Sequence, residues 1–176
     1  MVWNRKQKNG IIFSLFFLFM TGLTSCTISY KFNGASIDYT QVKSISIKDF
    51  PNMASLVYPP LAQNFSEALR DKYIRQTRLQ VLRENGTLDL EGEITGYEVR
   101  SQAPKGDGYD SDTRLTITIR VRYTNDVNPE DDMEQSFSAY RDFSSDKMIQ
   151  DVQDDLCAEI IDEIVDQIYN ATVANW

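Results

Sequence analysis

The residue of this chain with the clearest chemistry is Cys26, which closes the stretch Leu23-Thr24-Ser25-Cys26. This pattern is typical of bacterial lipoprotein signals, in which the cysteine is acylated and becomes the new N-terminus. A basic start and an apolar run over 11–20 precede it. The run is shorter than the about 20 apolar residues of a membrane-spanning helix and is typical of a secretory signal. We expect residues 1–25 to be a lipoprotein signal peptide, and the complete pattern favours acylation over an ordinary signal with an incidental cysteine.

Catalysis has few candidate residues, because the chain contains no histidine. This excludes Ser-His-Asp and Cys-His mechanisms and histidine-assisted zinc sites. An enzyme would have to use carboxylates, lysine, tyrosine or serine alone. The second cysteine, Cys157, shares helical spacing with Ile161, Ile164 and Ile168, so we expect a small buried residue rather than a reactive thiol.

Acidic side chains gather in the polar loop over 101–112, where Asp107, Asp110 and Asp112 suggest calcium binding. Their spacing is not that of an EF-hand, which needs alternating acids, a central glycine and a distal glutamate. A solvated acidic loop is the favoured interpretation. We expect no metal site and no cofactor.

Charge limits the partners of the mature chain. After removal of residues 1–25, 15 basic and 26 acidic residues remain in 151 residues, a net charge near −11. Such a charge opposes binding to nucleic acid and to anionic membrane surfaces. The link to the membrane is therefore expected to be the lipid on Cys26.

Hydrophobic periodicity predicts four strands and two helices in the order β-α-β-β-β-α. The predicted strands cover 42–50, 88–100, 114–123 and 135–143, and the helices cover 61–79 and 149–173. The apolar parity of the second strand changes at Gly96, which indicates a β-bulge. We expect an α+β fold, a two-layer sandwich of an about four-stranded sheet with both helices on one face. A lipidated lead over 26–40, with a short strand near Tyr30 and Phe32, precedes a single domain over 41–176.

The uncovered face of this sheet is expected to be charged. Glu91 and Glu93 alternate with the apolar residues of one strand, and Arg120 and Arg122 do so in the next. Opposite charges on neighbouring strands stabilise a sheet by about 0.2–1 kcal/mol for each pair. Two interpretations remain open, a plain solvent surface and a partner surface.

Several segments together resemble one family. They are the lipobox, YKFNGASI over 30–37, FPN over 50–52, PLAQNFSEALRDK over 60–72, LEGEITGY over 90–97, RLTI over 114–117 and NATVANW over 170–176. In this order the chain resembles the LptE family of lipopolysaccharide-assembly lipoproteins. The resemblance implies a non-enzymatic protein, anchored in the outer membrane and facing the periplasm, with a sheet and two helices on one face. It also implies a partner, the LptD β-barrel, which such proteins plug while lipopolysaccharide passes to the cell surface.

Contacts with lipopolysaccharide phosphates or with the barrel would involve arginines, since arginine bonds phosphate well. The candidates are Arg100, Arg114, Arg120 and Arg122; simple pairing with the glutamates of the neighbouring strand is the alternative. Two other functions stay open. One is an auxiliary lipoprotein of another envelope lipid transporter. The other is a carboxylate-based periplasmic glycosidase, although no motif places two carboxylates across a cleft.

Overall fold

The computed structural model describes residues 37–56, 58–103 and 112–173, and every structural statement below concerns these residues. They all lie in one unit of the chain, Asn33–Trp176. Cys26, the expected strand near Tyr30 and Phe32, and the loop residues Asp107 and Asp110 lie outside the described residues.

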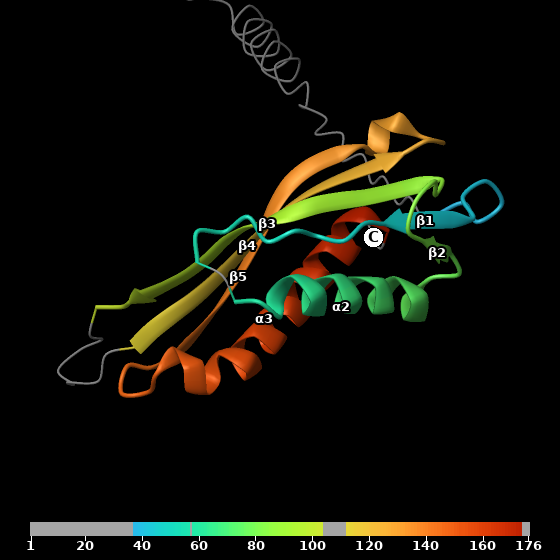
Figure 1. Ribbon diagram of the computed structural model, residues 1–176. Helices are drawn as coiled ribbons and strands as arrows, with labels where there is room; N and C mark the ends of the chain where they lie inside the picture. The colour runs from blue at the N-terminus through green and yellow to red at the C-terminus, as the bar shows by residue number, and fades with distance from the viewer. Residues whose placement is uncertain (1–36, 57, 104–111, 174–176) are drawn as a thin grey trace, which may run out of the picture. The chain divides into compact units, whose positions relative to one another are not determined.

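The chain forms one five-stranded sheet and two α-helices, and both helices lie on the same side of the sheet (Figure 1). The elements are β1 (Ser44–Ile47), α2 (Leu61–Gln76), β2 (Gln80–Leu82), β3 (Leu88–Ser101), β4 (Asp112–Asn125), the 3-10 turn η1 (Pro129–Asp131), β5 (Met133–Ser144) and α3 (Ile149–Thr172). The strand order is β2-β1-β3-β4-β5. The predicted α+β sandwich is confirmed.

The sheet contains one strand more than the sequence predicts. β2 is only three residues long and follows α2 directly, so it shows no alternation that could be recognised. It pairs parallel to β1, which is also parallel to β3, whereas β3, β4 and β5 are antiparallel. Parallel neighbours need a crossover connection, and α2 supplies the one between β1 and β2.

The core lies between the sheet and the helices. Along α2, Leu61, Phe65, Leu69 and Tyr73 are fully buried, at the spacing that puts them on one helix face. β4 contributes alternate residues, which are Leu115, Ile117, Ile119, Val121 and Tyr123. α3 contributes Cys157, Ile160, Ile161, Ile164, Val165 and Ile168. The buried residues on one face of each of these elements therefore form a single apolar layer between the sheet and the helices.

The β-bulge predicted beside Gly96 is present. The pairing of β3 with β4 shifts register between Ile94 and Gly96. Because of the extra residue, Ile94 before the bulge and Tyr97 after it both point to the helix side, where both are buried. The bulge thus keeps a 14-residue strand facing the same core along its length.

Gly92 is required by close packing. A Cβ atom there would lie 2.1 Å from the Arg120 carbonyl oxygen and 2.6 Å from the Phe50 ring. We predict that Gly92→Ala lowers the free energy of unfolding by about 1–3 kcal/mol, the usual cost of overpacking. Gly96→Ala is the control, because its Cβ would meet Thr118 at 3.2 Å and that side chain can shift. Urea denaturation measures both, and equal midpoints for the two variants would contradict the prediction.

Candidate functional site: the open face of the sheet

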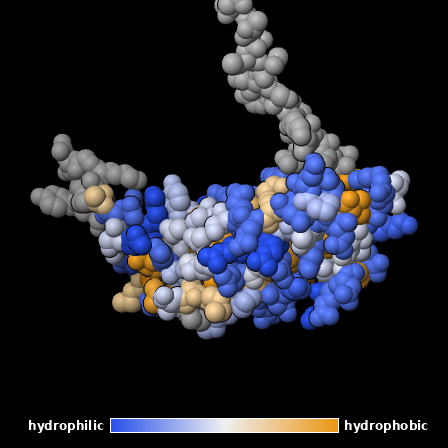
Figure 2. All heavy atoms as spheres, turned by 90° about the horizontal axis from the view of Figure 1, so that it is seen from above, coloured by the Kyte–Doolittle hydropathy of each residue, from blue (hydrophilic) through white to orange (hydrophobic). Residues whose placement is uncertain are grey.

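The face of the sheet opposite to the helices, called the open face below, carries the four arginines that the sequence singles out. Its residues alternate with the core residues along β3, β4 and β5. They are Asp89, Glu91, Glu93, Glu98 and Arg100 of β3, Arg114, Thr116, Thr118, Arg120 and Arg122 of β4, and Glu134, Ser136, Ser138, Tyr140 and Asp142 of β5. Seen from this side, the surface is mostly hydrophilic (Figure 2).

Ion pairs cross the open face from strand to strand. The register places Glu91 opposite Arg122 and Glu93 opposite Arg120, and the atoms of these pairs lie 3.3 and 3.2 Å apart. Arg122 also reaches Glu134 of β5 at 3.3 Å. The expected pairing of the glutamates with the arginines is therefore present.

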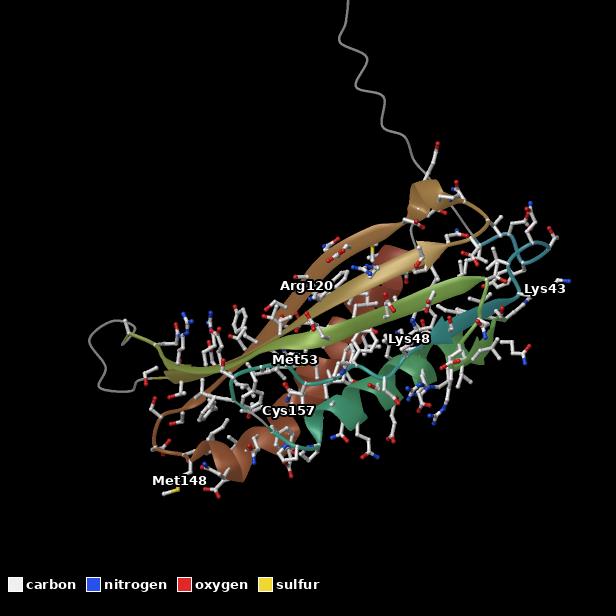
Figure 3. The ribbon with its side chains drawn as sticks, turned by 45° about the horizontal axis from the view of Figure 1, so that its top comes forward. Lys43, Lys48, Met53, Arg120, Met148 and Cys157 are labelled. Carbon is white, nitrogen blue, oxygen red and sulfur yellow. The ribbon has the colours of Figure 1, made fainter. Side chains whose placement is uncertain are left out.

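Lys48, directly after the end of β1, adds a further positive charge to this row of ion pairs. Its Nζ lies 2.6 Å from Glu91 and 3.5 Å from Asp89, and Figure 3 shows it with Arg120 on the side of the sheet away from the helices. The hydrogen bond from Lys48 lowers the pKa of Glu91, and the same bond raises the pKa of Lys48. Both groups stay charged near neutral pH, so each positive charge in this row faces a negative one.

Arg114 is held most firmly. Its Nε and Nη2 donate to the two carboxylate oxygens of Asp142 at 2.7 and 2.8 Å, and its guanidinium lies 3.6 Å from the centre of the Tyr140 ring. The bond to Asp142 raises the pKa of Arg114. Two-point bonding and stacking fix the plane of a guanidinium. Arg114 therefore has a defined orientation on the open face.

Arg100 is held least. It pairs at 2.7 Å with Glu98 of its own strand, and 74% of its side chain is exposed. The register sets it opposite Arg114, so two like charges face each other near the end of the hairpin. Arg100 is thus the most accessible of the four arginines.

The sequence does not predict three of the ion-pair partners on the open face, which are Lys48, Glu134 and Asp142. Lys48 lies in the predicted first strand, but the alternation of apolar and polar residues does not predict that this strand lies beside β3. Glu134 and Asp142 alternate correctly with Phe137 along β5, yet their pairing with arginines depends on the register, which sequence does not supply.

A shallow hollow of about 340 Å³ lies on the open face above Gly92. Its lining contains three basic side chains and four acidic ones, together with Pro51. The local charge is therefore not positive, which disfavours a free anion in the hollow. The described residues contain no cluster of three or more metal-ligating side chains. None of the described helices has the length and apolar character needed to cross a membrane.

Cys157 lies on the helix side, away from the open face (Figure 3). It is 1% exposed, as the helical spacing predicts. Burial raises the pKa of its thiol to about 11. Nearby, the Tyr58 hydroxyl donates to Asp154 at 2.5 Å, and that bond together with burial raises the pKa of Tyr58 to about 12. The thiol is an inert part of the core.

Comparison with known proteins gives one family. The model of a family described as LptE, lipopolysaccharide-assembly, matches residues 42–172, well over half of the chain. No curated protein matches the chain.

Similar solved structures include a hypothetical protein from Chlamydia trachomatis, with 10% identity, a TM-score of 0.50, and coverage of 76% of this chain and 99% of that one. Rare lipoprotein B from Shewanella oneidensis has 13% identity, a TM-score of 0.49 and coverage of 75% and 95%. A minor lipoprotein from Acinetobacter baumannii has 16% identity, a TM-score of 0.47 and coverage of 73% and 95%. At such identities the Chlamydia structure supports the fold alone.

The protonated Cys157 thiol and Tyr58 hydroxyl predict loss of stability in alkali. The unfolded chain releases these protons from about pH 9 and 10, whereas the folded chain retains them to about pH 11 and 12. The contribution of these two groups to the free energy of unfolding should therefore be constant between about pH 8 and 9 and fall above pH 9, by up to about 1.4 kcal/mol per pH unit for each group. Urea denaturation over pH 8–11 measures this. Cys157→Ala should flatten the slope between pH 9 and 11, and an unchanged slope would contradict the assignment.

Proposed function

Since the chain belongs to the LptE, lipopolysaccharide-assembly, family, we propose that it is an outer-membrane lipoprotein that plugs an LptD-like β-barrel and helps pass lipopolysaccharide to the cell surface. The observation that carries this proposal is the family match over 42–172. The work of this family is assembly, so the prediction that the chain is not an enzyme is confirmed. The barrel, the anchor at Cys26 and the arginine contacts are the proposed parts.

The length of the β3–β4 hairpin supports a plug. Each of the two strands has 14 residues. At about 3.3 Å per residue this corresponds to about 46 Å, whereas the apolar band of an outer-membrane barrel is about 25 Å tall. One end of the hairpin can therefore stay in the periplasm while the other reaches the far side of the lumen.

The chemistry of the open face supports the same role. Barrel lumens are polar, and a plug needs a surface that exchanges hydrogen bonds with such a wall. The threonines, serines and ion pairs of the open face offer these bonds without a free net charge. Exposed pairs are worth only about 0–1 kcal/mol, so Arg120 and Arg122 can exchange Glu93 and Glu91 for groups of a partner at little cost.

The four arginines divide into two proposed roles. Arg114, Arg120 and Arg122 lie within the paired surface of β4 and are proposed as barrel contacts. Arg100 is the most exposed of the four, and its ion pair among the described residues is with Glu98 of its own strand, so we propose it as the contact to a lipopolysaccharide phosphate. A phosphate would also relieve the like charges of Arg100 and Arg114.

The anchor at Cys26 would set which end of the domain lies near the membrane. Ile37 follows Cys26 by eleven positions, so the tether spans at most about 40 Å. Ile37 lines a cavity of about 440 Å³ with Leu88, Asn125 and Thr172, at the start of β3 and the end of α3. In the proposed arrangement this end lies close to the inner leaflet, and the far end of the hairpin points into the barrel.

The experiment that tests the proposal is extraction of a tagged chain from outer membranes in mild detergent, followed by mass spectrometry of its partners. The expected result is one large β-barrel protein in equal amount. A monomeric chain without a barrel would contradict the proposal. An inner-membrane ATPase complex in its place would favour the alternative, an accessory lipoprotein of another lipid transporter.

We predict that the double variant Arg120→Gln, Arg122→Gln retains the barrel poorly. Loss of one hydrogen bond from each charged group, at about 1.5–3 kcal/mol each, should weaken the complex about a hundredfold or more. The matched control is Arg75→Gln, which removes an exposed arginine of α2 that pairs with Asp71 of the same helix. Barrel recovery after washing measures the effect, and equal recovery from both variants would refute the contact.

We also predict that Arg100→Gln lowers the amount of lipopolysaccharide that co-purifies with the complex while barrel recovery stays constant. The guanidinium is lost, but the paired surface of β4 is not altered. Glu98→Gln is the control, because it frees Arg100 and should leave lipopolysaccharide unchanged or increase it. Reduced barrel recovery in Arg100→Gln would show that this arginine contacts the barrel instead.

A further inference from the structure

β5 forms one rim of the sheet, where its outer edge faces no other strand among the described residues (Figure 1). In an antiparallel pair, alternate residues bond to the neighbouring strand, and those between turn their N–H and C=O away. The Tyr140 carbonyl accepts a bond at 2.9 Å from Arg141 of its own strand, so it belongs to the outward set. By the period of two, Glu134, Ser136, Ser138 and Asp142 also turn their backbone groups outward.

This edge lacks the usual protection against strand addition. Edge strands are normally short, bulged, or interrupted by lysine or proline. β5 has 12 residues, its pairing with β4 continues without a register shift, and Gln135–Tyr140 contains neither charge nor proline. By contrast, β2 at the opposite rim has three residues and lies between Arg78 and Arg83. Ser136 and Ser138 are exposed, so the edge is accessible.

An acidic row borders this edge on the helix side. Arg141 of β5 bonds to Glu159 at 2.8 Å and to Glu163 at 2.6 Å, both in α3. A hollow of about 560 Å³ beside them is also lined by Asp162 and Asp166, and among the described residues Arg141 is the one basic side chain of its lining, while Lys72 of α2 reaches Asp166 at 2.6 Å. The hollow therefore has a negative charge, whereas the open-face side of the same edge carries the neutral Ser136 and Ser138.

This charge disfavours a second copy of the chain as the added strand. Pairing of two β5 edges continues the sheet and leaves both α3 helices on the same face, with their acidic rows toward the joint. The mature chain also has a net charge near −11. An added strand with basic side chains at every second position instead places them against Glu159, Glu163 and their neighbours.

We infer that the outer edge of β5, from Glu134 to Asp142, docks an extended segment of a partner protein, which adds a strand to the five-stranded sheet. The segment carries lysine or arginine at alternate positions that face α3, and neutral residues between them. The identification of that partner as the barrel rests on the proposed function. The edge itself does not depend on it.

The test uses the full chain in detergent and a synthetic eight-residue peptide that alternates lysine with threonine. Hydrogen exchange of the β5 amides is measured with this peptide and with a peptide that has glutamate in place of lysine. The lysine peptide should slow exchange at Ser136 and Ser138, and the glutamate peptide should not. No slowing, or equal slowing by both peptides, would overturn the inference.

A matched pair of variants tests the backbone bond. Ser136→Pro removes an outward N–H and leaves the bonds to β4 intact, whereas Ser136→Ala removes only the hydroxyl. The lysine peptide should bind Ser136→Pro about tenfold more weakly than Ser136→Ala. Equal binding of the peptide to the two variants would contradict docking at the edge of β5. If Ser136→Pro does not fold, the two-peptide comparison on the unaltered chain still decides.

The same exchange measurement on a purified barrel complex separates this inference from the proposed function. A barrel complex in which the β5 amides exchange as fast as in the free chain would overturn the identification of the barrel as the docked partner and leave the plug intact. Docking of the lysine peptide by a chain that recovers no barrel would support the edge and contradict the proposed function.

Discussion

The structure depends on one constraint, that two helices cover one face of the sheet and leave the other face open. Strand residues alternate between these faces, so β4 must be apolar at Leu115, Ile117 and Ile119 and polar at Arg114, Thr116 and Thr118. The bulge at Gly96 and the missing side chain at Gly92 keep β3 on the same core. The result is a long hairpin with one apolar face, packed against the helices, and one polar face, which is the open face.

The open face is charged, yet its charges are balanced locally. Lys48, Arg114, Arg120 and Arg122 each have a carboxylate within hydrogen-bond distance. Such a surface is soluble without attracting free anions, and it can exchange partners because each exposed pair contributes little. This combination fits a domain that must fold in water and then lie against a polar wall. Arg100 is paired too, with Glu98 of its own strand at 2.7 Å, but it is the most exposed of the four arginines and is therefore the one that we propose for a phosphate.

Much of the fold follows from periodicity. The two helices, the four longer strands, the bulge and the burial of Cys157 were all predictable, because each leaves a pattern of period 3.6 or 2 in the sequence. β2 was not, since three residues carry no period. The membership of Arg100, Arg114, Arg120 and Arg122 in one face was predictable from parity. Their partners were not, because Asp142 and Glu134 meet the arginines only through the register of β5, which long-range packing decides.

The most direct test of the plug is the accessibility of the open face in intact outer membranes. Ser138→Cys places a thiol on an exposed position of that face. Of the two native cysteines, Cys157 is buried and Cys26 is acylated in the proposed lipoprotein, so the background is small. In the isolated chain this thiol should react rapidly with a water-soluble maleimide. In outer membranes that contain the barrel it should react as slowly as Cys157. Equal rates in the membrane and in the isolated chain would contradict the enclosure of the domain by a barrel.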